Sequence, residues 1–98
     1  EKPRHANLNR QFPAFWAPEY AEYGAGELPL VEPEAAALAR FIVAHPNISG
    51  VQAYHSHGAI ILRPSSNLPD ADLDPADLDI FETIGAVGSR LTGYPVLS

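Results

Sequence analysis

Prolines constrain this chain more than any other feature of its sequence. Five of the ten prolines fall within the first 33 residues, among aromatic side chains and glycines. Neither the period of a helix nor that of a strand persists there, so we expect residues 1–31 to form a long ordered loop. The aromatic side chains argue against disorder, because disordered segments contain few of them. A loop of this length is uncommon inside a compact domain and usually carries function.

The first helix is expected over residues 32–45. Pro33 is tolerated in a first helical turn, and Pro46 disfavours helical geometry in the residue before it. Side chains that suit a buried face then recur at helical spacing, so one face of this helix should be buried. That predicted face consists of Leu38, Phe41, Ile42 and His45.

The second helix is expected over residues 74–91, with Asp74 as its N-cap and Pro75 at its first helical position. Gly85 and Gly88 would allow this helix to approach a sheet closely. A separate row of large side chains forms the predicted apolar stripe of the helix. This stripe consists of Ile80, Ile84, Val87 and Leu91.

Two short strands are expected within residues 51–63. Apolar and polar side chains alternate over residues 51–55, and an apolar segment over residues 59–63 ends at Pro64. A further strand would begin at Val96. This order of loop, helix, strands, helix and strand predicts an α/β fold in which both helices cover a small sheet.

The charge balance excludes two classes of partner. The 98 residues include six Lys and Arg against twelve Asp and Glu, and the basic residues are scattered. We therefore expect neither nucleic acid nor an anionic membrane surface as a partner. No apolar run approaches the roughly 18 residues of a membrane span. The length suits one small domain, and because the chain begins at Glu1 and ends just after an apolar stretch starts, we expect it to be a piece of a longer protein.

Two groups of residues could carry chemistry. His55 ends a predicted strand beside a glycine-containing turn, a position where α/β folds place sites, and histidine is a common metal ligand. Asn9 and Arg10 could bind a free carboxylate, because the guanidinium forms two parallel hydrogen bonds and the amide adds a donor. His55 could instead be a structural residue, and Arg10 could be a solvated surface arginine. The residue types alone do not decide between these roles. With no cysteine, thiolate ligands are excluded.

A cluster of aspartates near the second helix suggests calcium, but the spacing is wrong. An EF-hand loop that began at Asp70 would need glycine at position 75 and glutamate at position 81. The chain has Pro75 and Phe81 there. We therefore interpret these aspartates as a solvated loop and an acidic first helical turn.

Four segments, taken in order, resemble the zinc metallocarboxypeptidases of the carboxypeptidase A-like family. Residues 7–13 read N-L-N-R-Q-F-P, close to the family's D-x-N-R-N-F-P, with Trp16 after them. Residues 32–34 resemble its S-E-P-E helix start. Residues 55–64 resemble its H-S-x-G…L-x-P strand, and residues 91–94 resemble the end of its next helix. Each segment is weak alone, and the ordered set covers nearly the whole chain.

The resemblance implies a fold and a set of roles. The chain would be the middle portion of the family's mixed sheet between helices. His55 would be one zinc ligand, Asn9 and Arg10 would bind the terminal carboxylate of a peptide substrate, and Ser56 and His57 would lie along the substrate subsites. The family removes C-terminal residues from peptides with water activated on zinc. The resemblance also implies a cis peptide between Ser56 and His57, and is compatible with a secreted or extracytoplasmic protein, although the sequence itself assigns no compartment.

Several family features are missing from this chain. It has no His-x-x-Glu pair for the first two zinc ligands, and the family's catalytic glutamate belongs to a strand beyond Tyr94. We therefore assign no catalytic residue and expect the 98 residues alone to be inactive and to bind zinc weakly. Asn7, Gln11 and Val31 stand where the family has Asp, Asn and Ser, and the loss of that serine should remove a helix cap.

Two alternatives follow from these departures. The chain could be a non-catalytic relative that binds peptide C-termini, or a small α/β interaction module without peptidase descent. Unpaired sheet edges could also favour self-association of the chain.

Overall fold

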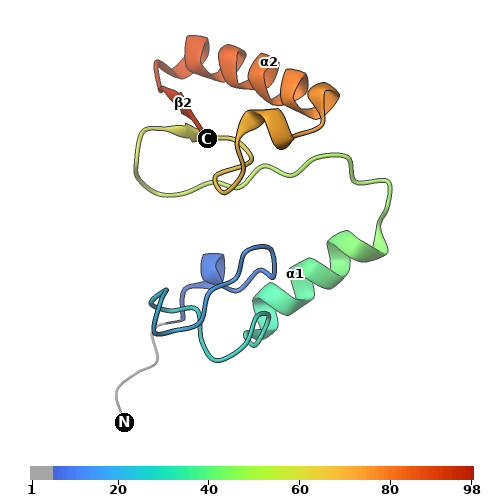
Figure 1. The fold of residues 1–98 in the computed structure, drawn as a ribbon, viewed down its shortest axis with the longest axis vertical. Coiled ribbons are helices and arrows are strands. Elements are labelled where there is room, and N and C mark those ends of the chain that lie inside the picture. Colours follow the sequence, from blue (N-terminus) through green and yellow to red (C-terminus); the bar gives the residue numbers. More distant parts are fainter. Residues whose placement is uncertain (1–5) are drawn as a thin grey trace. The chain divides into compact units, whose positions relative to one another are not determined.

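The computed structural model describes residues 6–98, and the chain divides into two compact units. The first unit ends at Gln52 and the second runs from Ala53 to Ser98. Figure 1 shows the two long helices, one in each unit. The elements in chain order are η1 (Leu8–Arg10), α1 (Pro33–Ala44), β1 (Ile61–Leu62), η2 (Asp70–Asp72), α2 (Pro75–Thr92) and β2 (Val96–Leu97).

The first unit consists of a long loop, the 3-10 turn η1 and the helix α1. The loop expected over residues 1–31 is irregular apart from η1, and its first five residues lie outside the described part of the chain. The helix α1 contacts η1. Only two apolar side chains among the described residues are buried, Ala25 and Ala35, and both belong to this unit.

The helix α1 begins and ends close to the predicted residues. Glu32 is its N-cap and makes no side-chain capping bond. Val31 lies one residue before this cap, so a serine at position 31 would not be the N-cap of α1, and the expected loss of a helix cap at this position is wrong. His45 follows the last helical residue, and its N–H donates to the carbonyl of Ile42. The His45 ring stacks on Phe41 with 4.1 Å between ring centroids.

The predicted buried face of α1 is largely wrong. Ala35 is buried and Ile42 is half-buried, whereas Leu38 and Phe41 are 49% and 56% exposed and His45 is also exposed. Small side chains allow close approach of a helix to its neighbours, so the alanine side of α1 faces inward. The helical spacing of the large apolar side chains showed that one face of α1 is apolar. It did not show which face the rest of the first unit would bury.

The second unit is a βαβ arrangement. The strands β1 and β2 pair in parallel, with Ile61 opposite Val96 and Leu62 opposite Leu97, and α2 connects them. The Ile61 N–H donates to the carbonyl of Pro95 at 2.9 Å. A parallel pair needs such a crossover, and a helix commonly supplies it. The mixed α/β class predicted from the sequence is therefore present.

The predicted sheet is corrected in two respects. The strand expected over residues 51–55 does not form, and the sheet of the described residues is parallel rather than mixed. Alternating side chains make a segment suitable for a strand, but a strand also needs a hydrogen-bonding neighbour. Within residues 6–98 no strand pairs with residues 51–55.

The start of α2 is as predicted, and its end has a glycine in the position that commonly ends a helix. The Asp74 carboxylate accepts a hydrogen bond from the Ala76 N–H at 2.8 Å, and Pro75 occupies the first turn. Gly93 has a φ of 77°, and its N–H donates to the carbonyl of Ser89. This left-handed conformation strongly favours glycine.

The glycines of α2 contact the sheet, whereas the four large apolar side chains of its predicted stripe are exposed. A Cβ added to Gly85 would lie 3.0 Å from Val96, and one added to Gly88 would lie 2.9 Å from Ile61. Close approach at the two glycines is therefore confirmed. The predicted apolar stripe is instead exposed, and we call it the outer stripe: Ile80 (54% exposed), Ile84 (65%), Val87 (41%) and Leu91 (77%).

No helix within residues 6–98 combines the length and the apolar character that crossing a membrane requires.

Candidate functional site

One buried glutamine holds the first-unit loop together. The Gln11 side chain is fully buried, and its Oε1 accepts hydrogen bonds from the N–H groups of Val31 at 2.9 Å and Glu32 at 3.2 Å. Its Nε2 donates to the carbonyl of Ala25. A buried amide is tolerated when its donors and acceptors are paired. These bonds join the start of the loop to the start of α1 and place the neighbouring Arg10 on an anchored backbone.

A second anchor is the carboxylate of Glu19. Its two oxygens accept hydrogen bonds from the backbone N–H groups of Gly24 and Gly26, at 3.1 and 2.7 Å. Both glycines have positive φ, 85° and 78°, a region that side chains disfavour. The segment from Glu19 to Gly26 is therefore a tight, carboxylate-centred turn beside Gln11.

The predicted carboxylate-binding pair lies on η1. Asn7 caps η1 by accepting from the Asn9 N–H at 3.1 Å, and the amide can fill that role as an aspartate would. The Asn9 residue is exposed, and its carbonyl accepts a 3.3 Å hydrogen bond from Arg10 Nη1. Asn9 and Arg10 are thus neighbours on a capped turn.

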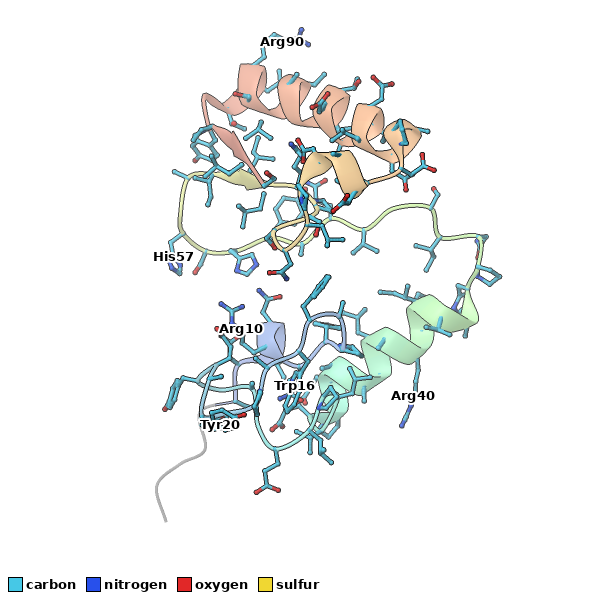
Figure 2. The ribbon with its side chains drawn as sticks, in the orientation of Figure 1. Arg10, Trp16, Tyr20, Arg40, His57 and Arg90 are labelled. Atoms are coloured by element: carbon cyan, nitrogen blue, oxygen red, sulfur yellow. The ribbon has the colours of Figure 1, made fainter. Side chains whose placement is uncertain are left out.

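Arg10 has a carboxylate partner within the loop. Its Nε donates to Glu22 Oε1 at 2.6 Å, and the two side chains are 41% and 44% exposed. Within residues 6–98, Nη2 has no hydrogen-bond partner. Figure 2 draws the side chains as sticks and, in this unit, labels Arg10, Trp16, Tyr20 and Arg40. Glu22 therefore holds the Nε side of the guanidinium, and among the described residues the edge formed by Nη1 and Nη2 makes only the 3.3 Å bond from Nη1 to Asn9.

The predicted metal ligand lies in an exposed segment of the second unit. His55, Ser56 and His57 are all exposed, and Ser56 Oγ lies 3.3 Å from His57 Nδ1. The chain bends there, and Gly58 has a φ of 120°. The cis peptide expected between Ser56 and His57 is not found. Among the described residues the one cis peptide bond joins Pro64 and Ser65.

The described residues supply one candidate zinc ligand rather than a zinc site. A zinc site needs at least three protein ligands. Within residues 6–98 no three His, Asp or Glu side chains come together as a metal-binding group. His55 could serve as one ligand, and no metal-assisted step follows from these residues alone.

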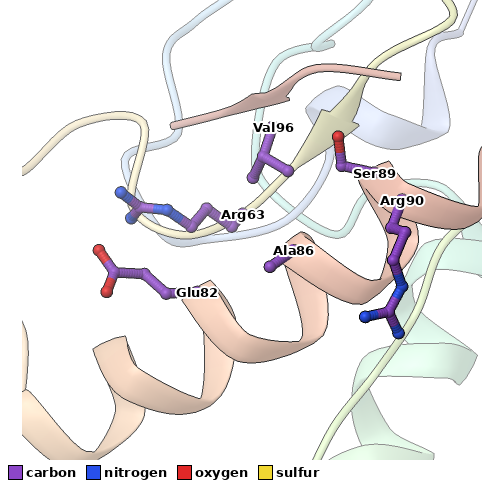
Figure 3. Close-up of a pocket in the computed structure, with 6 residues that line it drawn as sticks. All are labelled: Arg63, Glu82, Ala86, Ser89, Arg90 and Val96. Carbon is purple, nitrogen blue, oxygen red and sulfur yellow. The ribbon is translucent and has the colours of Figure 1, made fainter. Parts of the chain in front are cut away.

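A shallow, open groove of about 690 Å³ lies beside α2 in the second unit. Figure 3 shows Val96 and Ala86 on its walls, and the Arg90 guanidinium pointing away from Val96. Arg63, which also lines it, forms two hydrogen bonds to the Asp70 carboxylate at 2.9 and 2.6 Å. These bonds lower the pKa of Asp70 and raise that of Arg63, and the Glu82 charge raises the Arg63 pKa further. The Arg63 charge is thus already balanced, so we assign no ligand here.

Two residues that shape the Arg10 site were not predicted. Gln11 was treated only as a departure from the family pattern, and Glu22 was not considered. Their partners lie 12 to 21 residues away along the chain, so no local periodicity reveals them. The available signal was a polar amide between Arg10 and Phe12, in a segment rich in aromatic side chains.

The chain matches no known protein family, no curated protein and no solved structure in the three comparisons made with it.

Proposed function

We propose that this chain is the carboxylate-recognising portion of a zinc metallocarboxypeptidase-like domain, which removes C-terminal residues from peptides. In this proposal Arg10 and Asn9 bind the terminal carboxylate. His55 supplies one zinc ligand in a complete domain, and Ser56 and His57 line the substrate subsites. Zinc, when bound, would activate water for hydrolysis of the peptide bond. The ordered family-like segments support this assignment.

The sparsely bonded Nη1–Nη2 edge of Arg10, on a side chain that is 41% exposed, is the observation that carries the proposal. Arg10 Nη2 is unpaired among the described residues, and Nη1 makes only a 3.3 Å bond to Asn9. A carboxylate could accept two parallel hydrogen bonds from this edge, which provides both charge and planar shape. Glu22 fixes the guanidinium through Nε, so less rotamer entropy is lost when a ligand binds. Its negative charge also weakens the attraction of a second carboxylate.

A binding-only role is the second candidate function. Three zinc ligands do not come together in residues 6–98, whereas the arginine edge is present. A domain that binds peptide C-termini without cleaving them needs the arginine edge alone. Both functions use the same recognition chemistry, and both predict that a free carboxylate is distinguished from an amide.

The test is titration of the 98-residue chain with an acetylated dipeptide, as free acid and as C-terminal amide, followed by NMR. We expect the acid to shift the amide signals of Asn9 and Arg10, and the amide to do so much less. Arg10→Ala should weaken binding of the acid by roughly threefold to tenfold, a modest effect because the side chain is part exposed. Arg10→Lys should lose most of the same affinity, because it keeps the charge without the fork. Glu22→Gln should strengthen it.

Arg40→Ala is the matched control, because Arg40 is an exposed arginine on α1 in the same unit. It should leave acid binding unchanged. Equal binding of acid and amide, or an equal loss in the Arg40 and Arg10 variants, would show that Arg10 does not recognise the carboxylate. Adding zinc and testing His55→Ala would then separate the metal role from recognition.

A further inference from the structure

The outer stripe of α2 is an apolar surface with an unusual spacing. Its four side chains follow one another at intervals of four, three and four residues. This is the spacing of the contact positions in paired helices, where large side chains of one helix fill gaps between those of another. Each member is between 41% and 77% exposed. The stripe therefore has the form of a helix-pairing seam without a partner in the second unit.

A neighbouring face of α2 is already in use. Gly85 and Gly88 lie against Val96 and Ile61 of the sheet, so α2 cannot turn its outer stripe inward without losing that contact. No apolar side chain of residues 53–98 is buried. A helix that is apolar on two sides is normally covered on both. The second unit therefore needs a partner for the outer stripe.

The order of residues in the stripe is nearly symmetric about its centre. In an antiparallel pair of α2 helices related by a two-fold axis between positions 85 and 86, Ile80 would face Leu91 of the other copy. Ile84 would likewise face Val87, so each contact pairs two branched aliphatic side chains. A two-fold interface uses the same patch twice, and this patch is complementary to itself. The antiparallel direction also opposes the two helix dipoles favourably.

The charges of α2 favour the same direction. Its first half carries Asp77, Asp79 and Glu82, whereas Arg90 is the one charged residue in its second half. The antiparallel arrangement brings Arg90 of one copy to the level of Asp79 and Glu82 of the other. A parallel arrangement would place the acidic halves together, and like charges at that distance repel.

We propose that the outer stripe is a self-association surface on which α2 pairs antiparallel with α2 of a second copy of this chain. The proposal rests on the second unit alone and does not depend on the role of Arg10. Four side chains per copy make a seam far smaller than a standard interface of about 1,600 Å². The dimer should therefore be concentration-dependent, with a dissociation constant in the micromolar range.

The first test is the molar mass of the chain measured by sedimentation between about 5 and about 500 µM. We expect a shift from a 10.6 kDa monomer toward twice that mass. Ile84→Glu should keep the chain monomeric at every concentration with the circular dichroism of the parent chain, because position 84 is already 65% exposed. Arg90→Glu should weaken the dimer about tenfold through repulsion from the acidic half of the partner helix.

Val43→Glu is the matched control, because Val43 on α1 is 83% exposed and lies outside the stripe. It should dimerise as the parent chain does. A chain that stays monomeric at the highest concentration would overturn the proposal, as would equal loss of dimer in the Val43 and Ile84 variants.

The direction of pairing can be tested because the chain has no cysteine of its own. An equimolar mixture of Ile84→Cys and Val87→Cys chains, treated with a short bifunctional thiol reagent, should form mainly the mixed cross-link. Each variant alone should cross-link less. Preferential cross-linking of each variant with itself would indicate parallel pairing and would overturn the antiparallel arrangement. Absence of any cross-link at a concentration that gives dimers would place the interface elsewhere.

Discussion

The two units of this chain are held together by different kinds of contact. In the first unit, the buried side chain of Gln11 bonds to three backbone groups of a long loop, and the Glu19 carboxylate bonds to two more. In the second unit, α2 lies on two short strands at Gly85 and Gly88, and Arg63 joins Asp70. The first unit is organised by directional polar bonds, and the second by close approach of backbone.

This difference predicts different responses to change. Directional bonds to a buried group are costly to break, because each unpaired partner remains desolvated. Close approach of the helix backbone at a glycine tolerates no added volume where the neighbouring side chain is rigid. In α2 it also leaves the outer stripe uncovered. The first unit should therefore depend on one side chain, and the second should depend on what its glycines contact and on what covers its outer stripe.

The largest expected effect is that of Gln11→Leu. The substitution removes three hydrogen bonds and leaves the Ala25 carbonyl and the N–H groups of Val31 and Glu32 without their partner. Each buried unpaired group costs about 1–3 kcal/mol, so the total loss is several kcal/mol and comparable with the stability of a small domain. We expect amide protection from hydrogen exchange to be lost across the first unit and retained in α2.

Gln52→Leu is the control for this experiment, because Gln52 is exposed. It should leave the exchange pattern of the first unit unchanged. If Gln11→Leu left the first unit protected, the loop would be held by other contacts. If it removed protection from both units equally, the contrast between them would be wrong.

The second prediction separates the two glycines of α2. An alanine in a helix is favoured over glycine by about 1 kcal/mol, whereas an overpacked core position costs about 1–3 kcal/mol. A Cβ at position 85 would meet two methyl groups of Val96, at 3.0 and 3.3 Å, and valine is stiff. At position 88 it would meet the terminal methyl of Ile61, which can rotate away.

Gly85→Ala should therefore destabilise the second unit by about 1 kcal/mol, and Gly88→Ala should be neutral or stabilise it by up to about 1 kcal/mol. Urea unfolding of both variants, followed through signals of residues in α2, measures the two changes. Equal effects of the same sign would mean that the helix does not lie on the sheet as described.

Local signals in the sequence predicted the helices well and the sheet poorly. Asp74, Pro75 and Gly93 specify the ends of α2 through backbone conformation and capping, which depend on neighbouring residues alone. Residues 51–55 have a strand pattern, but the described part of the chain gives them no strand neighbour. The strand pairing of Ile61 with Val96 joins residues far apart in the chain, and the sequence shows where such strands could start but not which of them meet.

The candidate site likewise has residues that local motifs identify and contacts that only the folded loop creates. Arg10 and His55 were identified from short motifs, and their roles stay predictions. The bond from Arg10 to Glu22 and the three bonds of Gln11 depend on how the loop folds back on itself. The predicted buried face of α1 was largely wrong for a related reason, and the apolar stripe of α2 is exposed. A row of large apolar side chains indicates a face that needs cover and not the element that covers it.

The smallest expected effect concerns the ion pair of the second unit. The Asp70 carboxylate accepts two hydrogen bonds from Arg63, and these lower its pKa below the usual value of about 3.9. The folded chain then binds fewer protons than the unfolded chain between the lowered pKa and about pH 4. Stability from the pair is present in full above that window and is lost as the pH falls through it.

Asp70→Asn should therefore lower the melting temperature of the second unit slightly at pH 7, by a few degrees at most, because the carboxylate is part exposed and solvent screens the pair. The difference between parent and variant should shrink as the pH falls below 4, since protonation removes the same charge from the parent.

Asp72→Asn is the control, because Asp72 is an exposed carboxylate of the same short turn and is outside the pair with Arg63. It should not reproduce this pH dependence. A difference between Asp70→Asn and the parent that stayed constant from pH 7 to pH 2 would mean that Asp70 acts through shape or hydrogen bonding alone. Directional bonds would then contribute to the second unit as they do to the first, beside the close approach of α2 to the sheet.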